Sequence, residues 1–161
     1  MIQLLLFLHV GAAIVAFGPT FMLSMVGAMS RAEPMHANFS LRLGDRITYR
    51  RIYPFALSMP VTGVLLIWAT GIDVLAPRSL WLLAAIVLYV VALGYSYLVQ
   101  TPTIRRMIEL TSRPPGPPGE GAIVGPPPEL LALGAKAAQG GMLLVALVTV
   151  ILGLMIFKPG S

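Results

Sequence analysis

The stretch Gln3–Met29 contains no Asp, Glu, Lys or Arg, and this constrains the fold more than any other feature of the chain. A helix of this length is ~40 Å long, which is enough to cross the ~30 Å hydrocarbon core of a membrane with some tilt. The sequence therefore predicts a membrane-spanning helix, against which other apolar segments must pack.

The composition supports the same prediction for the rest of the chain. Hydrophobic residues make up 57% of it and charged residues 11%, whereas a soluble domain usually carries about 25% charged residues. We predict an all-α polytopic membrane protein, a single domain built as a bundle of four transmembrane helices in up-and-down order. The expected helices cover residues 2–29, 52–70, 80–100 and 132–157.

Residues 111–128 differ in kind from these spans. Seven of the eighteen residues are proline and four are glycine. Such a composition cannot build a core and favours an extended or flexible chain. We expect a tether between the third and fourth helices. A proline-recognition ligand is the less favoured alternative.

The basic residues predict the orientation in the membrane. The first and third connections carry nine Lys and Arg residues, whereas the other side carries only Arg78 and Lys158. Because basic residues collect on the cytoplasmic side, we expect both long connections, and hence the tether, in the cytoplasm. Both termini would then lie outside the inner membrane of a bacterial cell. The net charge of +5 is explained in this way, so nucleic acid is not an expected partner.

The first connection has the pattern of an amphipathic helix. Phe39, Leu43 and Ile47 recur every four residues, and an adjoining stripe carries arginines. We predict a helix lying at the interface, with arginine side chains reaching lipid headgroups. The alternative is a cytoplasmic extension of the second membrane helix. The expected headgroup ligands are Arg42, Arg46, Arg50 and Arg51.

His9 is the ionisable residue inside the first span, and such residues are expensive in a membrane. Its imidazole could ligate haem b or copper, and a homodimer could supply a second His9 because His36 lies a full helix away. The alternative is a hydrogen bond to a neighbouring helix, for instance to Tyr89 or Thr149.

Met22, Met25 and Met29 line one face of the first helix. Thioethers suit Cu(I), but methionine is also a routine apolar filler of helix bundles. Met22 lies thirteen residues from His9, which is ~20 Å along a helix, so these groups cannot form one site within a single chain.

Several segments resemble a bacterial family of predicted integral membrane proteins of unknown function. They are LHVGAAIVAFGPTF at 8–21, VQTPTIRRMIEL at 99–110, GGMLL at 140–144 and IFKPG at 156–160. The resemblance covers nearly the whole chain and implies a four-helix membrane fold without an assigned activity. Leu8-His9 alone is similar to the first helix of copper-resistance D-like proteins and of the four-helix protoporphyrinogen oxidase. That oxidase also needs a lysine in a later membrane helix, and the third span here has none.

Catalytic groups are missing from the sequence pattern. The six acidic residues fall in connections or at helix ends, and no nucleophile triad or phosphate loop occurs. We therefore favour a non-enzymatic membrane component that packs with itself or with other membrane proteins in a larger complex. The alternatives are a haem- or copper-linked redox protein using His9, and a protein that binds lipid or a small hydrophobic molecule.

Overall fold

The computed structural model describes residues 1–112 and 127–160, which form four long helical rods. The first rod is α1 (Ile2–Ala32) and the fourth is α6 (Pro128–Phe157). The second and third rods are each built from two α-helices joined by a π-helical turn. They are α2 (Ala37–Ile47), η2 (Thr48–Ile52) and α3 (Tyr53–Thr70), and then α4 (Leu80–Tyr95), η4 (Ser96–Gln100) and α5 (Thr101–Ser112). Short 3-10 helices lie at Pro34–His36 (η1) and Pro77–Ser79 (η3).

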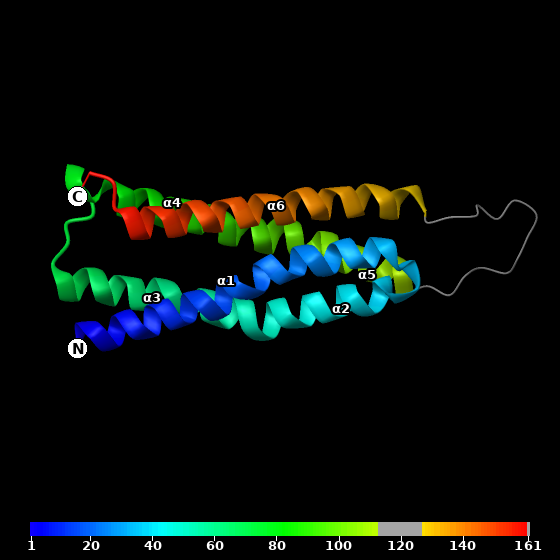
Figure 1. Ribbon diagram of the computed structural model, residues 1–161, viewed down its shortest axis with the longest axis horizontal. Coiled ribbons are helices and arrows are strands. Elements are labelled where there is room, and N and C mark those ends of the chain that lie inside the picture. Colours follow the sequence, from blue (N-terminus) through cyan, green and yellow to red (C-terminus); the bar gives the residue numbers. More distant parts are fainter. Residues whose placement is uncertain (113–126, 161) are drawn as a thin grey trace, which may run out of the picture.

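The rods run alternately up and down, as Figure 1 shows, so both termini and the α3–α4 connection lie at the same end. Successive rods are neighbours: α1 packs against α3, α2 against α5, α4 against α6, and α6 returns to α1. The prediction of an all-α bundle of four transmembrane helices is confirmed, because each rod is long and apolar enough to cross a membrane.

Small residues form much of the contact between the rods. Ala12, Ala16, Ala56, Ala85 and Ala92 are buried, and they let neighbouring backbones approach closely. Many larger apolar side chains instead face outward along the whole bundle. In water such a surface would be unstable, but in a bilayer the lipid chains solvate it.

The arginine-rich segment is an extension of the second membrane helix. Residues 37–70 form one continuous helix, so α2 stands upright on α3 instead of turning aside along the interface. The prediction of a separate interface helix is wrong on this point, and the alternative of an extended second helix holds, while its cytoplasmic location stays a prediction. No glycine or proline interrupts residues 45–53, so nothing in the sequence breaks the helix there.

The third rod also continues past the apolar span to Ser112, while α6 begins at Pro128. The tether predicted at residues 111–128 therefore overlaps α5 and α6 at its ends. Residues 113–126 of the predicted tether lie outside the described residues.

The two π turns share a sequence pattern. Each begins with a hydroxyl residue and a tyrosine, at Thr48-Tyr49 and Ser96-Tyr97, and each is followed by an X-Pro pair. In an ordinary α turn the N–H of Tyr53 would donate to the carbonyl of Tyr49, and that of Thr101 to the carbonyl of Tyr97. Here each N–H donates to the carbonyl five residues back, Tyr53 to Thr48 and Thr101 to Ser96. A proline ring collides with the carbonyl four residues earlier in an α-helix, and a widened turn relieves that collision.

Candidate functional site

A cavity of about 870 Å³ lies between the rods in the half of the bundle away from the termini. Its volume falls in the range of small-molecule sites in proteins, roughly 300–1,000 Å³. The second half of α1, α2, the η4–α5 segment and the first half of α6 all contribute to its wall. The cavity is therefore a product of the whole bundle and belongs to no single pair of helices.

The wall of the cavity has two chemical sides. Apolar side chains come chiefly from α1 and α6, including Leu23, Val26, Met142 and Leu144. The polar side lies at the π turns and their flanks, with Thr48, Ser96, Gln100 and Thr101. Further uncharged polar side chains line the wall from α1, α2 and α5, and they are Thr20, Ser24, Ser30, Ser40 and Thr111. Asp45 is the one charged residue among the described residues of this wall. Such a cavity suits an amphipathic molecule with a long apolar part.

A buried hydrogen-bond network holds the polar side in place. The hydroxyls of Tyr53 and Thr101 lie 2.6 Å apart, and Ser96 Oγ lies 3.3 Å from the same tyrosine oxygen. Tyr53 and Thr101 are both buried, and they are the residues that precede the two prolines. This bond ties the second rod to the third at the level of the two π turns.

Gln100 is positioned by a close approach of α6. Its Nε2 donates to the carbonyl oxygen of Ala137 at 3.0 Å. A Cβ at Gly140 would overlap Gln100 Oε1 and come within 2.7 Å of the Tyr95 hydroxyl, so a larger residue there would displace these two side chains. Gly141 also lines the cavity, but a Cβ there meets nothing within 4 Å.

Ser30 offers a polar group to the cavity that the described residues do not satisfy. Ser30 lines the wall, and its Oγ is buried without a hydrogen-bond partner. A buried hydroxyl without a partner is costly, commonly about 1–3 kcal/mol. A bound molecule that carries a donor or acceptor would remove that cost.

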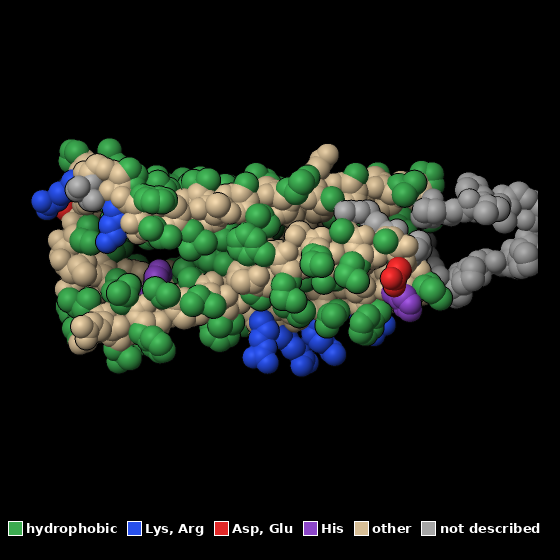
Figure 2. Space-filling model, viewed as in Figure 1, with side chains coloured by type: hydrophobic (Ala, Val, Ile, Leu, Met, Phe, Trp, Pro, Cys, Tyr) green, Lys and Arg blue, Asp and Glu red, His purple; other side chains and the backbone are tan. Residues whose placement is uncertain are grey.

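The four arginines predicted to bind headgroups divide into two pairs. All four are exposed, and Figure 2 shows basic side chains gathered on one edge of the bundle near its middle. Arg42 and Arg46 line a second hollow, of about 600 Å³, between α2 and α5. Arg50 and Arg51 do not line it, whereas Arg105 from α5 does.

His9 contacts the second rod instead of either residue named from the sequence. Its Nδ1 lies 2.8 Å from Thr62 Oγ1, and its ring approaches Gly63. Tyr89 donates to the carbonyl of Ala56, and Thr149 donates to the carbonyl of Val145. The predicted interhelical hydrogen bond exists, but both suggested partners were wrong, because the depth of a residue in its span does not fix which helix it faces.

The hydroxyl of Thr62 has backbone acceptors on its own helix as well as His9. The single hydroxyl proton of Thr62 is directed at the carbonyls of Ser58 and Met59, 3.2 and 3.1 Å away. When Thr62 donates to either carbonyl, Nδ1–H of His9 donates to Thr62, and in a neutral imidazole Nε2 then keeps the lone pair. The prediction that His9 ligates haem b or copper stays a prediction.

The methionines do not join His9. Met22, Met25 and Met29 are 70%, 68% and 56% exposed, so they point away from the bundle and from the cavity. Within residues 1–112 and 127–160, no group of three or more His, Asp or Glu side chains is placed to hold a metal ion. The copper role of these methionines likewise stays a prediction.

Sequence reasoning missed the cavity and its polar side. The sequence shows polar residues at the end of the third apolar span, at Gln100, Thr101 and Pro102. It also shows a Tyr-Pro pair, Tyr53-Pro54, at the start of the second span. The usable signal was the repeated pattern of hydroxyl residue, tyrosine and X-Pro in the second and third rods.

Comparison with known proteins agrees with this architecture. A family model described as a predicted integral membrane protein matches residues 3–159, which is almost the whole chain. No curated protein and no solved structure matches the chain. None of these comparisons supports the looser likeness to copper-resistance D-like proteins. The chain therefore belongs to the family described as "Predicted integral membrane protein (DUF2269)".

Proposed function

We propose that this protein binds a membrane lipid or a similar amphipathic small molecule in the cavity between its rods. The observation that carries the proposal is the cavity of about 870 Å³, whose apolar side chains come chiefly from α1 and α6 and whose uncharged polar side chains include those of the π turns. Apolar walls with a few placed polar groups are the usual form of a small-molecule site.

The chemistry of the wall indicates which molecules would enter. Leu23, Val26 and Leu144 favour a hydrocarbon chain, while the hydroxyl of Thr101 and the amide of Gln100 favour a hydroxyl or carbonyl group. A fully apolar molecule would leave the buried hydroxyl of Ser30, which has no hydrogen-bond partner among the described residues, still without one. We therefore expect a lipid-like molecule with a polar end over a pure hydrocarbon.

The proposed orientation places the cavity at the cytoplasmic face of a bacterial inner membrane. The two termini lie at one end of the bundle, and the arginines of α2, η2 and α5 lie toward the other half. α3 alone is 18 residues long, or ~27 Å, which matches the hydrocarbon core. The basic residues then lie at and beyond the cytoplasmic headgroups, with both termini outside.

Packing with a second copy or in a larger membrane complex, the function favoured from the sequence, stays a prediction. Both functions can coexist, because the cavity lies inside one chain and outward faces remain for a neighbour.

The test of cavity binding compares two substitutions in the same helix. Gly141→Leu would place a side chain in the cavity, since a Cβ there meets nothing within 4 Å. Gly153→Leu adds the same atoms to α6 at an equally open position that does not line the cavity. Native mass spectrometry of protein purified in mild detergent would measure retained lipid.

We expect Gly141→Leu to lose most of the lipid that the unsubstituted protein retains, and Gly153→Leu to keep it. Equal retention by all three proteins would overturn the proposal. Circular dichroism and gel filtration of each variant would show that the bundle is intact.

A further inference from the structure

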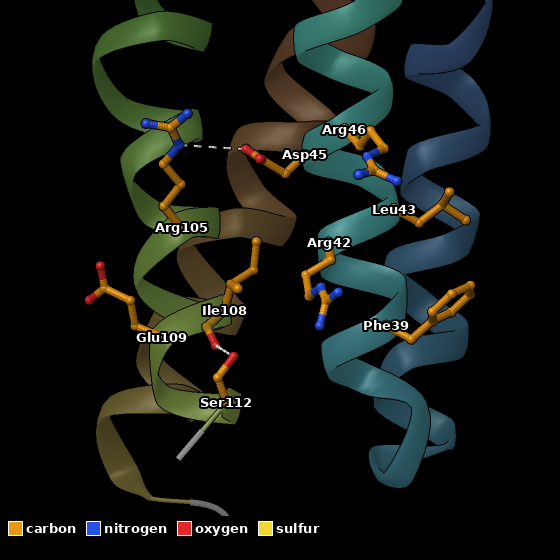
Figure 3. A pocket seen from close by; sticks show the side chains of 9 residues that line it. All are labelled: Phe39, Arg42, Leu43, Asp45, Arg46, Arg105, Ile108, Glu109 and Ser112. Carbon is orange, nitrogen blue, oxygen red and sulfur yellow. Dashed lines mark hydrogen bonds and ion pairs between the residues drawn. The ribbon is translucent and has the colours of Figure 1, made fainter.

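The hollow between α2 and α5 is lined by both basic and apolar side chains. Figure 3 shows its nine lining residues, among them Arg42 and Arg46 on α2 and Arg105 on α5. Phe39, Leu43 and Ile108 supply apolar surface in the same hollow. We call this hollow the arginine groove.

Two guanidinium groups in the groove have no ion-pair partner among residues 1–112 and 127–160. Within the described part of the chain, no carboxylate oxygen lies within 4 Å of Arg42 or Arg46. Glu109, the second acidic residue of the groove, instead pairs with Arg106 at 3.1 Å. The groove therefore keeps donors for an anion from outside the chain.

The third guanidinium is only loosely held. Arg105 Nε lies 3.7 Å from Asp45 Oδ1, and Figure 3 shows this carboxylate directed across the groove toward Arg105. Arg105 is about half exposed, and pairs of this kind contribute little stability. Arg105 also lies over the ring of Tyr49, 4.5 Å from its centroid, so its position survives without Asp45.

The groove adjoins the cavity through one residue, because Asp45 lines both. Farther along the same seam, Asn38 Nδ2 donates to Thr111 Oγ1 and Ser112 Oγ, each at 2.9 Å. The Asn38 contacts fasten one end of the α2–α5 seam and the Arg105–Tyr49 contact fastens the other. The Asp45–Arg105 pair closes the middle.

We propose that the arginine groove binds the phosphate of an anionic membrane lipid, and that this phosphate competes with Asp45 for Arg105. The phosphate accepts from Arg42 and Arg46, and the glycerol region of the lipid lies against Phe39, Leu43 and Ile108. The inference rests on the proposed lipid-binding function and names its ligand class. The position supports a lipid over a soluble anion, since Arg46 lies five residues, or ~8 Å, beyond Arg51 at the membrane boundary.

The experiment measures selectivity between two lipids with the same acyl chains. Dioleoyl phosphatidylglycerol and dioleoyl phosphatidylcholine would compete for the full-length protein in mild detergent, with occupancy read by native mass spectrometry. Arg42→Gln/Arg46→Gln removes two charges from the groove. Arg50→Gln/Arg51→Gln removes two exposed charges beside it and serves as the matched control.

We expect the unsubstituted protein to prefer the anionic lipid by roughly tenfold or more, and the groove variant to lose that preference. The control variant should keep most of it. Asp45→Asn should raise the preference, because the competing carboxylate is gone. A purely structural role of Asp45 would not produce such a gain.

Several results would overturn the inference. They are equal losses in both arginine variants, no change in the groove variant, or no gain with Asp45→Asn. Inorganic phosphate or glycerol 3-phosphate that displaces the lipid at equal concentration would show that the site takes a soluble anion instead.

The failure of this inference can be separated from the failure of cavity binding. Gly141→Leu should lower the occupancy of both lipids without changing their ratio. If it lowers occupancy while the arginine variants change nothing, the cavity proposal holds and the groove proposal fails. If Gly141→Leu changes nothing while the groove variant loses selectivity, the groove proposal holds and the cavity proposal fails.

Discussion

At the scale of single residues, two adjacent glycines in α6 have different roles. Gly140 is buried against Gln100 and Tyr95, whereas Gly141 faces the open space of the cavity. The sequence analysis had no means to tell them apart, because both are small residues in an apolar span. The distinction depends on which helix packs against each of them.

Gly140→Ala should destabilise the protein by about 1–3 kcal/mol, since the added methyl overlaps Gln100 and Tyr95. Gly141→Ala should be neutral or stabilising by up to about 1 kcal/mol, because alanine is the better helix former. Thermal unfolding in detergent followed by circular dichroism would measure both. Equal effects of the two substitutions would contradict the assigned packing.

His9 and Thr62 should act as a coupled pair. Each single substitution to alanine removes the same 2.8 Å hydrogen bond, so the double variant should be less destabilised than the sum of the two. Interhelical bonds of this kind average about 0.6 kcal/mol in membrane proteins. Strict additivity would show that the bond contributes nothing.

The cofactor prediction for His9 needs a separate measurement. An absorption spectrum and metal analysis of the purified protein, with His9→Ala alongside, would provide it. A Soret band or bound copper that is lost in the variant would establish His9 as a ligand.

At the scale of elements, hydropathy predicted the helices well but not the π turns. Proline alone does not specify a π turn, since Pro19 and Pro60 lie inside α1 and α3 without one. The two π turns form where the X-Pro pair of the second rod contacts the X-Pro pair of the third rod, through the hydrogen bond between Tyr53 and Thr101. Such a pairing depends on the register between rods, which a single sequence does not reveal.

Tyr53→Phe should destabilise the bundle by about 1 kcal/mol, because the buried hydroxyl of Thr101 loses its partner. Tyr97→Phe is the matched control. Tyr97 is 59% exposed and makes no side-chain hydrogen bond to the described residues, so its change should stay within about 0.5 kcal/mol. Thermal unfolding of both variants in the same detergent would measure the two destabilisations. A larger effect at Tyr97 would contradict the network.

At the scale of the whole molecule, composition and charge were sufficient to predict four membrane helices. They could not predict the cavity, because its wall combines residues from four rods that are distant in sequence. They also could not separate Arg42 and Arg46 from Arg50 and Arg51, since all four share one charged stretch. The partner that distinguishes them, α5, lies some sixty residues later in the chain.

The proposed orientation is testable with reporter fusions. Alkaline phosphatase fused after Ser161 should be active, because both termini are expected outside the inner membrane. A fluorescent protein that requires the cytoplasm should stay dark at the same position. The opposite pair of results would contradict the orientation.

The paired X-Pro turns also have a mechanical consequence. Beyond them, α2 and α5 extend side by side for 11 and 12 residues, or ~17 Å. A swing of ~5° at such a turn would displace the far end of either helix by ~1.5 Å. Because Tyr53 and Thr101 bond across the two turns, α2 and α5 share one pivot point. At their far ends the two helices are joined by the hydrogen bond from Asn38 to Thr111. The width of the cavity mouth would then be set from a single point deep in the bundle.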